Sequence, residues 1–292
     1  MQRTQEPDST GTIADEGPAD RWDTLEYILN RSGSSARGYV PIHKVFVQSP
    51  RDSVPKGASR AGPLAKFVKG SDARGLHAFL LANAAITSGD GEDGWSAAYP
   101  LPVWARALGV GETTSSRSIA GAAMSKTFKR LEERSLITRT RRGTDRAVRI
   151  TLLRPDGSGE PFSREDYRGR DRYLRLSTCL WDRDADWLGK LDLPALAMLL
   201  TLLHEPAEGV DLPTEKMQLW YGWSADTAER GLGLLEELDI VKKQGHWRKE
   251  PAAPEGRTWT NHYQVIGDFA VPSRAPAVED TDTSGDAPRR DA

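Results

Sequence analysis

Long apolar segments occur in two regions of the chain, and shorter amphipathic segments follow each of them in the same order. The first apolar segment is GLHAFLLANAAI from Gly75, and the second is LDLPALAMLLTLL from Leu191. Their composition predicts two largely buried helices. Upstream of each lies a strand-like stretch that opens with tyrosine, YVPIHKVFV at Tyr39 and YLRLSTCLW at Tyr173. The pattern therefore predicts a duplicated unit.

The two copies correspond most clearly further downstream. LEERSLIT from Leu131 and LEELDIVK from Leu235 align without a gap, and each ends a long amphipathic segment. Shorter segments that open with Leu-Pro precede them, LPVWARALG from Leu101 and LPTEKMQLWYG from Leu212. Proline suits the first turn of a helix. We therefore expect each copy to run strand, helix, short helix, turn, helix, strand, hairpin loop, strand.

The long helix of the first copy has two chemically different faces. Hydroxyl side chains at 114–116 suit its N-cap. One stripe at helical spacing is apolar and predicts core packing: Ala120, Met124, Phe128 and Leu131. The opposite face is small, hydroxylic or basic, as suits a helix in the major groove of DNA, and its candidate contact residues are Arg117, Ser118, Ser125, Lys126 and Lys129.

A hairpin with an arginine-rich tip, TRTRRGTDR, follows this helix. Leu136 to Thr140 and Arg146 to Leu153 have strand character, with Gly143 and Thr144 as the turn. A tip needs only turn chemistry, so its arginines require another explanation. They suit phosphate contacts or the narrow minor groove of A·T-rich DNA, where the negative potential is strongest. The alternative is a solvated hairpin on an ordinary surface. The candidate arginines are Arg139, Arg141, Arg142 and Arg146.

Charge is distributed unevenly along the 292 residues. The formal net charge is −2, yet residues 31–154 hold 21 Lys/Arg against 9 Asp/Glu. Both ends of the chain are acidic and rich in Pro, Gly, Ser and Thr, which predicts disorder, apart from a short helix from Arg21. We expect a disordered tail at 1–30, a first domain at 31–154, a linker at 155–172, a second domain at 173–268 and a disordered tail at 269–292.

The second copy is less suited to DNA. Residues 173–265 hold 10 basic and 15 acidic side chains, and its long helix, Ser224 to Leu238, presents acidic groups. A net negative surface repels phosphate, so contact with the DNA backbone is expected only through its hairpin, at Lys242, Lys243, Arg248 and Lys249. Tryptophan is frequent in this copy. Most of these rings are expected in the core, and a partly exposed group would suit a protein partner or a second protomer.

Several classes of protein fit the sequence poorly. Cys179 is the only cysteine, which excludes an intramolecular disulfide and fits a reducing compartment. The N-terminus has no apolar signal region and no apolar stretch is long enough to span a bilayer, so we expect a cytoplasmic, nucleoid-associated protein without membrane contact. The histidines form no metal-binding or catalytic motif, and no glycine-rich phosphate loop follows a strand. We therefore expect neither an enzyme nor a cofactor.

Residues Ser125 to Leu152 resemble the end of the recognition helix and the wing of winged-helix regulators of the multiple-antibiotic-resistance type. Asp145 and Arg146 match the aspartate-arginine pair of that wing. The resemblance implies that Arg146 or a neighbour enters the minor groove while Asp145 holds it in place. Ala147 departs from the pattern, because such regulators often carry a second arginine there, and the second copy lacks the pair. The tandem arrangement resembles plasmid and phage replication initiators that carry two winged-helix domains.

The sequence thus predicts a mostly α protein with small β-hairpin wings, of the α+β class, built from two tandem winged helix-turn-helix domains. We expect it to bind double-stranded DNA and to control transcription or plasmid or phage replication by occupying a site. The first copy is the expected DNA reader, and the second is an auxiliary or assembly module, with a homodimer or protein partner. The alternative is a winged-helix module for protein interaction or oligomerisation with little DNA specificity.

Overall fold

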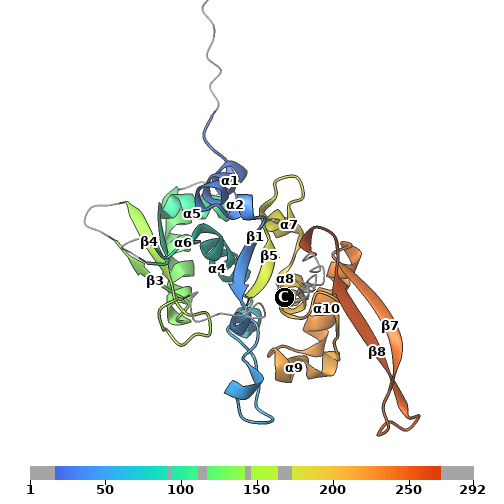
Figure 1. Cartoon of the computed structure of the whole chain (residues 1–292). Coiled ribbons are helices and arrows are strands. Elements are labelled where there is room, and N and C mark those ends of the chain that lie inside the picture. The colour runs from blue at the N-terminus through green and yellow to red at the C-terminus, as the bar shows by residue number, and fades with distance from the viewer. Residues whose placement is uncertain (1–16, 91–93, 111–116, 142–145, 164–172, 271–292) are drawn as a thin grey trace, which may run out of the picture.

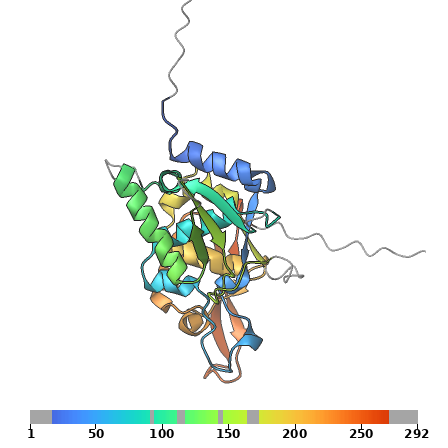
Figure 2. The same cartoon turned by 90° about the vertical axis from the view of Figure 1, so that its left-hand side faces the viewer.

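The computed structural model describes residues 17–90, 94–110, 117–141, 146–163 and 173–270. They form two mixed units of helices and small antiparallel sheets that lie side by side, joined through a central pair of strands (Figure 1). Figure 2 shows the long helix α6 along one side of the first unit, next to its sheet.

The described secondary structure divides between the two units. The first contains α1 (Arg21–Ser32), α2 (Ser34–Arg37), β1 (Tyr39–His43), α3 (Leu64–Lys69), α4 (Ala73–Ala85), β2 (Ser96–Pro100), α5 (Leu101–Ala107), α6 (Arg117–Glu133), β3 (Ile137–Thr140) and β4 (Ala147–Leu152). The second contains β5 (Tyr173–Ser177), α7 (Trp187–Lys190), α8 (Leu193–His204), β6 (Val210–Asp211), α9 (Met217–Trp220), α10 (Ala225–Glu237), β7 (Val241–Lys249) and β8 (Arg257–Val265). Short 3-10 helices lie at Lys44–Phe46, Arg51–Ser53, Thr178–Trp181, Thr214–Lys216 and Gly267–Phe269.

Both units have the same connectivity. From α4 and from α8, the chain runs helix, strand, short helix, helix, strand, strand. The sheet orders correspond as well, β2-β4-β3 in the first unit and β6-β8-β7 in the second, so the last strand of each unit lies in the middle. The strands β2 and β6 were missing from the order predicted by the sequence, because they are short and do not show regular alternation of apolar and polar residues.

The segments LEERSLIT and LEELDIVK have the same backbone conformation. Ser135 and Asp239, which align with each other, both have left-handed backbones, with φ of 56° and 54°. In each unit the next residue donates its N–H across this turn, Leu136 to the Leu131 carbonyl at 3.1 Å and Ile240 to the Leu235 carbonyl at 2.9 Å. Such a φ is uncommon for residues other than glycine. Its occurrence at both aligned positions supports the duplication.

The apolar stripe predicted for α6 is confirmed. Ala120, Met124, Phe128 and Leu131 are all buried. The Phe128 ring meets the Trp104 ring of α5 edge-to-face, with centroids 5.5 Å apart, so the stripe fixes α6 against the preceding helix. Pro102 lies in the first turn of α5, as expected. The hydroxyl residues expected to cap α6, at 114–116, lie outside the described residues.

The strands β1 and β5 pair with each other across the two units. Their register runs antiparallel from Tyr39 opposite Ser177 to His43 opposite Tyr173. The four apolar residues of the pairs Val40–Leu176 and Ile42–Leu174 are almost fully buried. Directly opposite residues lie on the same face of a sheet, so these four form one shared apolar layer. In Figure 1 the two strands lie between α4 and α8.

The boundaries of the two folded units differ from those predicted. The short helix predicted from Arg21 is confirmed as α1, but it extends past the predicted end of the N-terminal tail at residue 30, and its residues Leu25 and Ile28 are fully buried in the core. The predicted linker contributes Phe162, which is buried against Trp95 with ring centroids 5.1 Å apart. Phe269, assigned to the C-terminal tail, is buried against Trp187. The folded units therefore extend beyond the predicted domains.

A buried carboxylate fastens α6 to the N-terminus of α4. Asp72 is 8% exposed and caps α4 by accepting from the Gly75 N–H at 3.0 Å. It also accepts from two arginine side chains of the α6 region, with Arg130 Nη2 at 2.8 Å and Arg134 Nη1 at 2.6 Å. Burial raises the pKa of Asp72, but hydrogen bonds from the two arginines outweigh it and lower the pKa from 3.8 to about 2. The ion pairs therefore favour the folded state wherever Asp72 is ionised.

This network predicts a specific loss of stability in acid. A carboxyl whose pKa is lowered by folding contributes stability above its unfolded value of 3.8, and that stability is lost as pH falls toward about 2. The shift corresponds to roughly 2 kcal/mol. Asp72→Asn should lower the free energy of unfolding by about this amount near pH 7 and flatten its dependence on pH between 4 and 2. Chemical denaturation across this pH range measures both effects; an unchanged pH dependence would contradict the assignment.

Candidate nucleic-acid interface

Helix α6 and the β3–β4 hairpin together form the candidate interface of the first unit. Lys126 and Lys129 of α6 are exposed, as are Arg141 after β3 and Arg146 before β4. Ser125 of α6 and Arg141 line one shallow depression of about 290 Å³ between helix and hairpin, together with Leu101, Glu132, Arg139, Thr140 and Val148. The fold thus brings Ser125 of the predicted helix face together with Arg139 and Arg141 of the predicted hairpin.

Arg139 has an intramolecular role that the sequence did not reveal. Its Nε donates to the Glu132 carboxylate at 2.7 Å, and its Nη1 donates to the Ser125 carbonyl at 3.0 Å. The Arg139 backbone N–H also donates to Glu132, at 3.0 Å. These bonds tie β3 to the second half of α6. We therefore assign Arg139 to positioning the hairpin, and its predicted contact with DNA remains a prediction.

The lysine side chains of α6 make weaker intramolecular contacts than Arg139 does. Lys129 Nζ lies 3.9 Å from Glu133, one turn along the helix, and both side chains are largely exposed. Exposed pairs of this kind contribute little to stability and exchange readily with other charges. Lys126 is also exposed. Both ammonium groups therefore remain accessible to an anionic partner.

Four residues of the predicted interface have no described side chain. Arg117 and Ser118 lie in the first turn of α6, but their side chains are outside the described residues. Arg142 and Asp145 also lie outside them. The pairing of Asp145 with Arg146, implied by the resemblance to wing sequences, thus stays a prediction.

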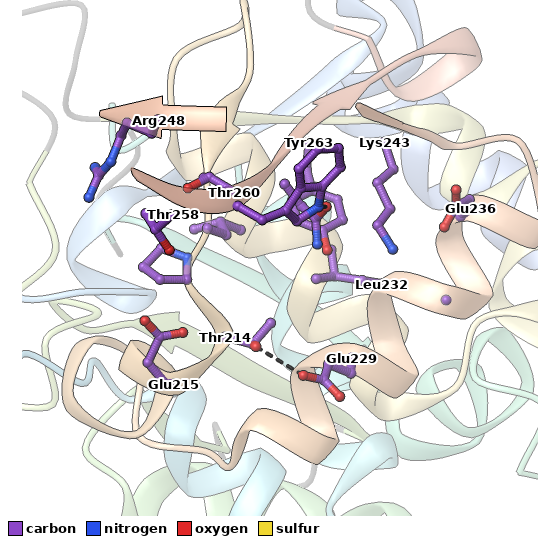
Figure 3. Close-up of a pocket in the computed structure, with 15 residues that line it drawn as sticks. Thr214, Glu215, Glu229, Leu232, Glu236, Lys243, Arg248, Thr258, Thr260 and Tyr263 are labelled. Carbon is purple, nitrogen blue, oxygen red and sulfur yellow. Dashed lines mark hydrogen bonds between the residues drawn. The ribbon is translucent and has the colours of Figure 1, made fainter. Parts of the chain in front are cut away.

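The corresponding surface of the second unit is acidic. A groove of about 400 Å³ lies between α10 and the β7–β8 hairpin. Figure 3 shows Glu215, Glu229 and Glu236 around it, with Lys243 and Arg248 contributed by the hairpin. Thr214 donates to Glu229 at 2.9 Å. The groove therefore combines three carboxylates with two cations, which disfavours the phosphate backbone of a duplex.

The β7–β8 hairpin displays the cations predicted for this unit. Lys242, Lys243, Arg248 and Lys249 are all exposed. Arg248 Nη2 lies 3.5 Å from Glu250 Oε2. The tryptophans of this unit fall into three groups: Trp181 and Trp223 are buried, Trp187 and Trp220 are partly buried against the core, and Trp247 and Trp259 of the hairpin are more than half exposed.

Sequence reasoning expected acidic groups on the long helix of the second copy, and Glu229 of α10 is one of them. Glu236, seven residues further along, lies on the same helical face and was not singled out. The Glu132–Arg139 pair joins a helix to the following strand, so helical periodicity could not reveal it. Within the described residues, no group of His, Cys, Asp or Glu side chains is placed to hold a metal ion, and no helix is long and apolar enough to cross a membrane.

Comparison with known proteins found no matching family model, no matching curated protein and no matching solved structure.

The contrast between Arg139 and Arg141 gives a stability prediction. Arg139→Ala should lower the free energy of unfolding by about 1 to 2 kcal/mol, because it removes charge-assisted bonds in a partly buried setting. Arg141→Ala, the matched control in the same hairpin, should change it by less than about 0.5 kcal/mol, because Arg141 is exposed. Urea denaturation of both variants measures the difference; equal effects would show that Arg139 does not hold the hairpin.

Proposed function

We propose that the protein binds double-stranded DNA through its first unit and that both units are winged-helix domains. The order helix, strand, short helix, helix, strand, strand supports this, as does a sheet with the last strand in the middle, found in both units. In this proposal α6 is the recognition helix and the β3–β4 hairpin is the wing. The use is control of transcription or of plasmid or phage replication by site occupancy.

The observation that carries the proposal is the shared surface of α6 and the β3–β4 hairpin. Ser125 of the helix and Arg141 of the hairpin line one depression. Lys126 and Lys129 on the same helix and Arg146 on the same hairpin are exposed. A helix of this kind fits the major groove, and cations beside it pair with phosphates. The segment 31–154, with 21 basic against 9 acidic residues, provides a field that attracts DNA.

The two units have different roles in this proposal. The acidic groove of the second unit makes it a poor duplex reader, so it serves as an auxiliary or assembly module. A homodimer or a protein partner through this unit belongs to the same proposal. The alternative, a module for protein interaction or oligomerisation with little DNA specificity, predicts that the arginines of the first hairpin make no difference to DNA binding.

The salt dependence of duplex binding tests the proposal. Replacing both Arg141 and Arg146 by alanine should reduce the slope of log affinity against log salt by about 0.9 for each phosphate that the variant no longer neutralises. Replacing Arg51 and Lys56, which are exposed in a different part of the first unit, removes the same charge and should leave the slope nearly unchanged. Fluorescence anisotropy with labelled duplex at several salt concentrations provides the measurement.

The experiment uses the intact chain, because β1 of the first unit pairs with β5 of the second and the units therefore fold together. The melting temperature of each variant must equal that of the parent before slopes are compared. We expect Arg141→Ala to weaken binding to all duplex sequences about equally, as the loss of a phosphate contact does. Arg146→Ala should weaken binding to A·T-rich duplexes more than to G·C-rich ones. If the Arg141/Arg146 double variant has the same slope of log affinity against log salt as the parent, duplex binding through this hairpin is contradicted.

A further inference from the structure

The β7–β8 hairpin is a ribbon that projects from the second unit (Figure 1). Eight of the nine residues of β7 are exposed, and only Val241 at its base is buried. The base is anchored, because the imidazole Nδ1 of His262 lies 2.9 Å from the Asp211 carboxylate of β6. The ribbon therefore has a fixed origin and an outer part that is open to a partner.

Two tryptophans lie opposite each other on this outer part. Trp247 and Trp259 are a directly paired cross-strand couple, 51% and 54% exposed. Their rings meet edge-to-face with centroids 5.4 Å apart. Such a couple stabilises a hairpin, and that structural role is the first explanation to consider. It does not explain why both tryptophans remain more than half exposed.

The indole ring of Trp259 is held in a fixed orientation on the ribbon. Its ring lies directly over Gly245, where even a Cβ atom would overlap the six-membered ring. Its Nε1 donates to the Asn261 side-chain oxygen at 3.2 Å, which fixes the orientation of the ring. One side of the indole is thus covered by the ribbon while the remainder is exposed. A partner that stacks on it meets a ring that is already ordered, which lowers the entropy cost of binding.

Cations flank the tryptophan pair. The Arg257 guanidinium lies 4.3 Å from the Trp247 ring centroid, and Arg257 pairs across the ribbon with Lys249. Lys249 is exposed, and the Lys249–Arg257 pair lies on the same face of the ribbon as the tryptophans. Aromatic rings interleaved with cations are the surface on which bases stack while phosphates are neutralised. An apolar protein partner would leave these cations without a partner, so the charge favours an anionic ligand.

We propose that the outer part of the β7–β8 ribbon binds single-stranded nucleic acid, with an unpaired base stacked on Trp259. In a duplex each base is already stacked on its neighbours, so the indole can receive only a base that has left the stack. Trp259 also lines the inner groove, where the three carboxylates of Glu215, Glu229 and Glu236 outnumber the cations of Lys243 and Arg248. Lys249 and Arg257 lie outside this groove and are the expected phosphate contacts. This site goes beyond the proposed duplex binding and uses none of the residues of α6 or the β3–β4 hairpin.

Anisotropy with labelled oligothymidylate and oligouridylate tests the proposal on the full chain. The parent should bind at low salt, and the two probes distinguish DNA from RNA. Trp259→Ala should weaken binding by roughly 5- to 150-fold, the range for one stacked base. Gly245→Ala should also weaken it, because the new methyl group displaces the ring while the tryptophan remains. Trp259→Phe should retain most of the affinity.

Matched controls separate stacking from general effects. Tyr27→Ala removes a ring that is 53% exposed on α1, and Gly121→Ala adds a methyl group in open space on α6; both should bind oligothymidylate as the parent does. The Arg141/Arg146 double variant should lose duplex affinity and keep oligothymidylate affinity, so the two proposals can fail separately. If Trp259→Ala does not fold, the other two variants test the proposal: Gly245→Ala should weaken oligonucleotide binding, and Trp259→Phe should retain most of the affinity.

Three results would overturn the proposal. The first is a parent chain that binds neither oligonucleotide, and the second is folded Trp259→Ala and Gly245→Ala variants that bind as the parent does. The third is a Trp259→Ala variant that loses self-association in light scattering while its oligonucleotide affinity is unchanged. That outcome would assign the tryptophan pair to a protein interface.

Discussion

The antiparallel pairing of β1 with β5 is the interaction on which the rest of the molecule depends. A strand of five residues without a partner presents unpaired backbone groups, and a lone two-stranded pair is marginally stable in water. Here the pair is covered by both units, since Val40, Ile42, Leu174 and Leu176 form one buried layer. Each unit thus completes the other, and separating them would expose a sheet edge and an apolar face.

This constraint also explains why a duplicated chain can contain two different surfaces. The equivalent strands at the start of the copies pair with each other, and the apolar stripes of α6 and α10 pack in the cores. The remaining faces of these helices can differ in sequence without destabilising the fold. One has lysines beside an arginine hairpin, and the other has glutamates beside a long ribbon with exposed tryptophans.

Patterns with a short period were predictable from the sequence, and contacts between distant segments were not. The stripe from Ala120 to Leu131 follows helical spacing, and the aligned segments at Leu131 and Leu235 share backbone conformation, so both were recognised. Asp72 was not, because its arginine partners lie about sixty positions away and only folding brings them together. The buried face of α1 was assigned to a tail because its flanking residues are acidic and polar. Arg139 resembled its hairpin neighbours in sequence, and only the position of Glu132 sets it apart.

Under the proposed function, the difference in charge between the two units determines which of their surfaces meets DNA first. The cationic unit attracts phosphate over a distance of about one Debye length, whereas the acidic groove of the second unit repels it. A duplex therefore meets α6 and the β3–β4 hairpin first, under the proposed function. The second unit is then held nearby through β1 and β5 at a fixed distance, so its weaker contacts act at a high effective concentration. Under the two proposals the ribbon binds a single strand by itself, and its fixed attachment to the first unit raises the local concentration of any unpaired strand near a bound duplex.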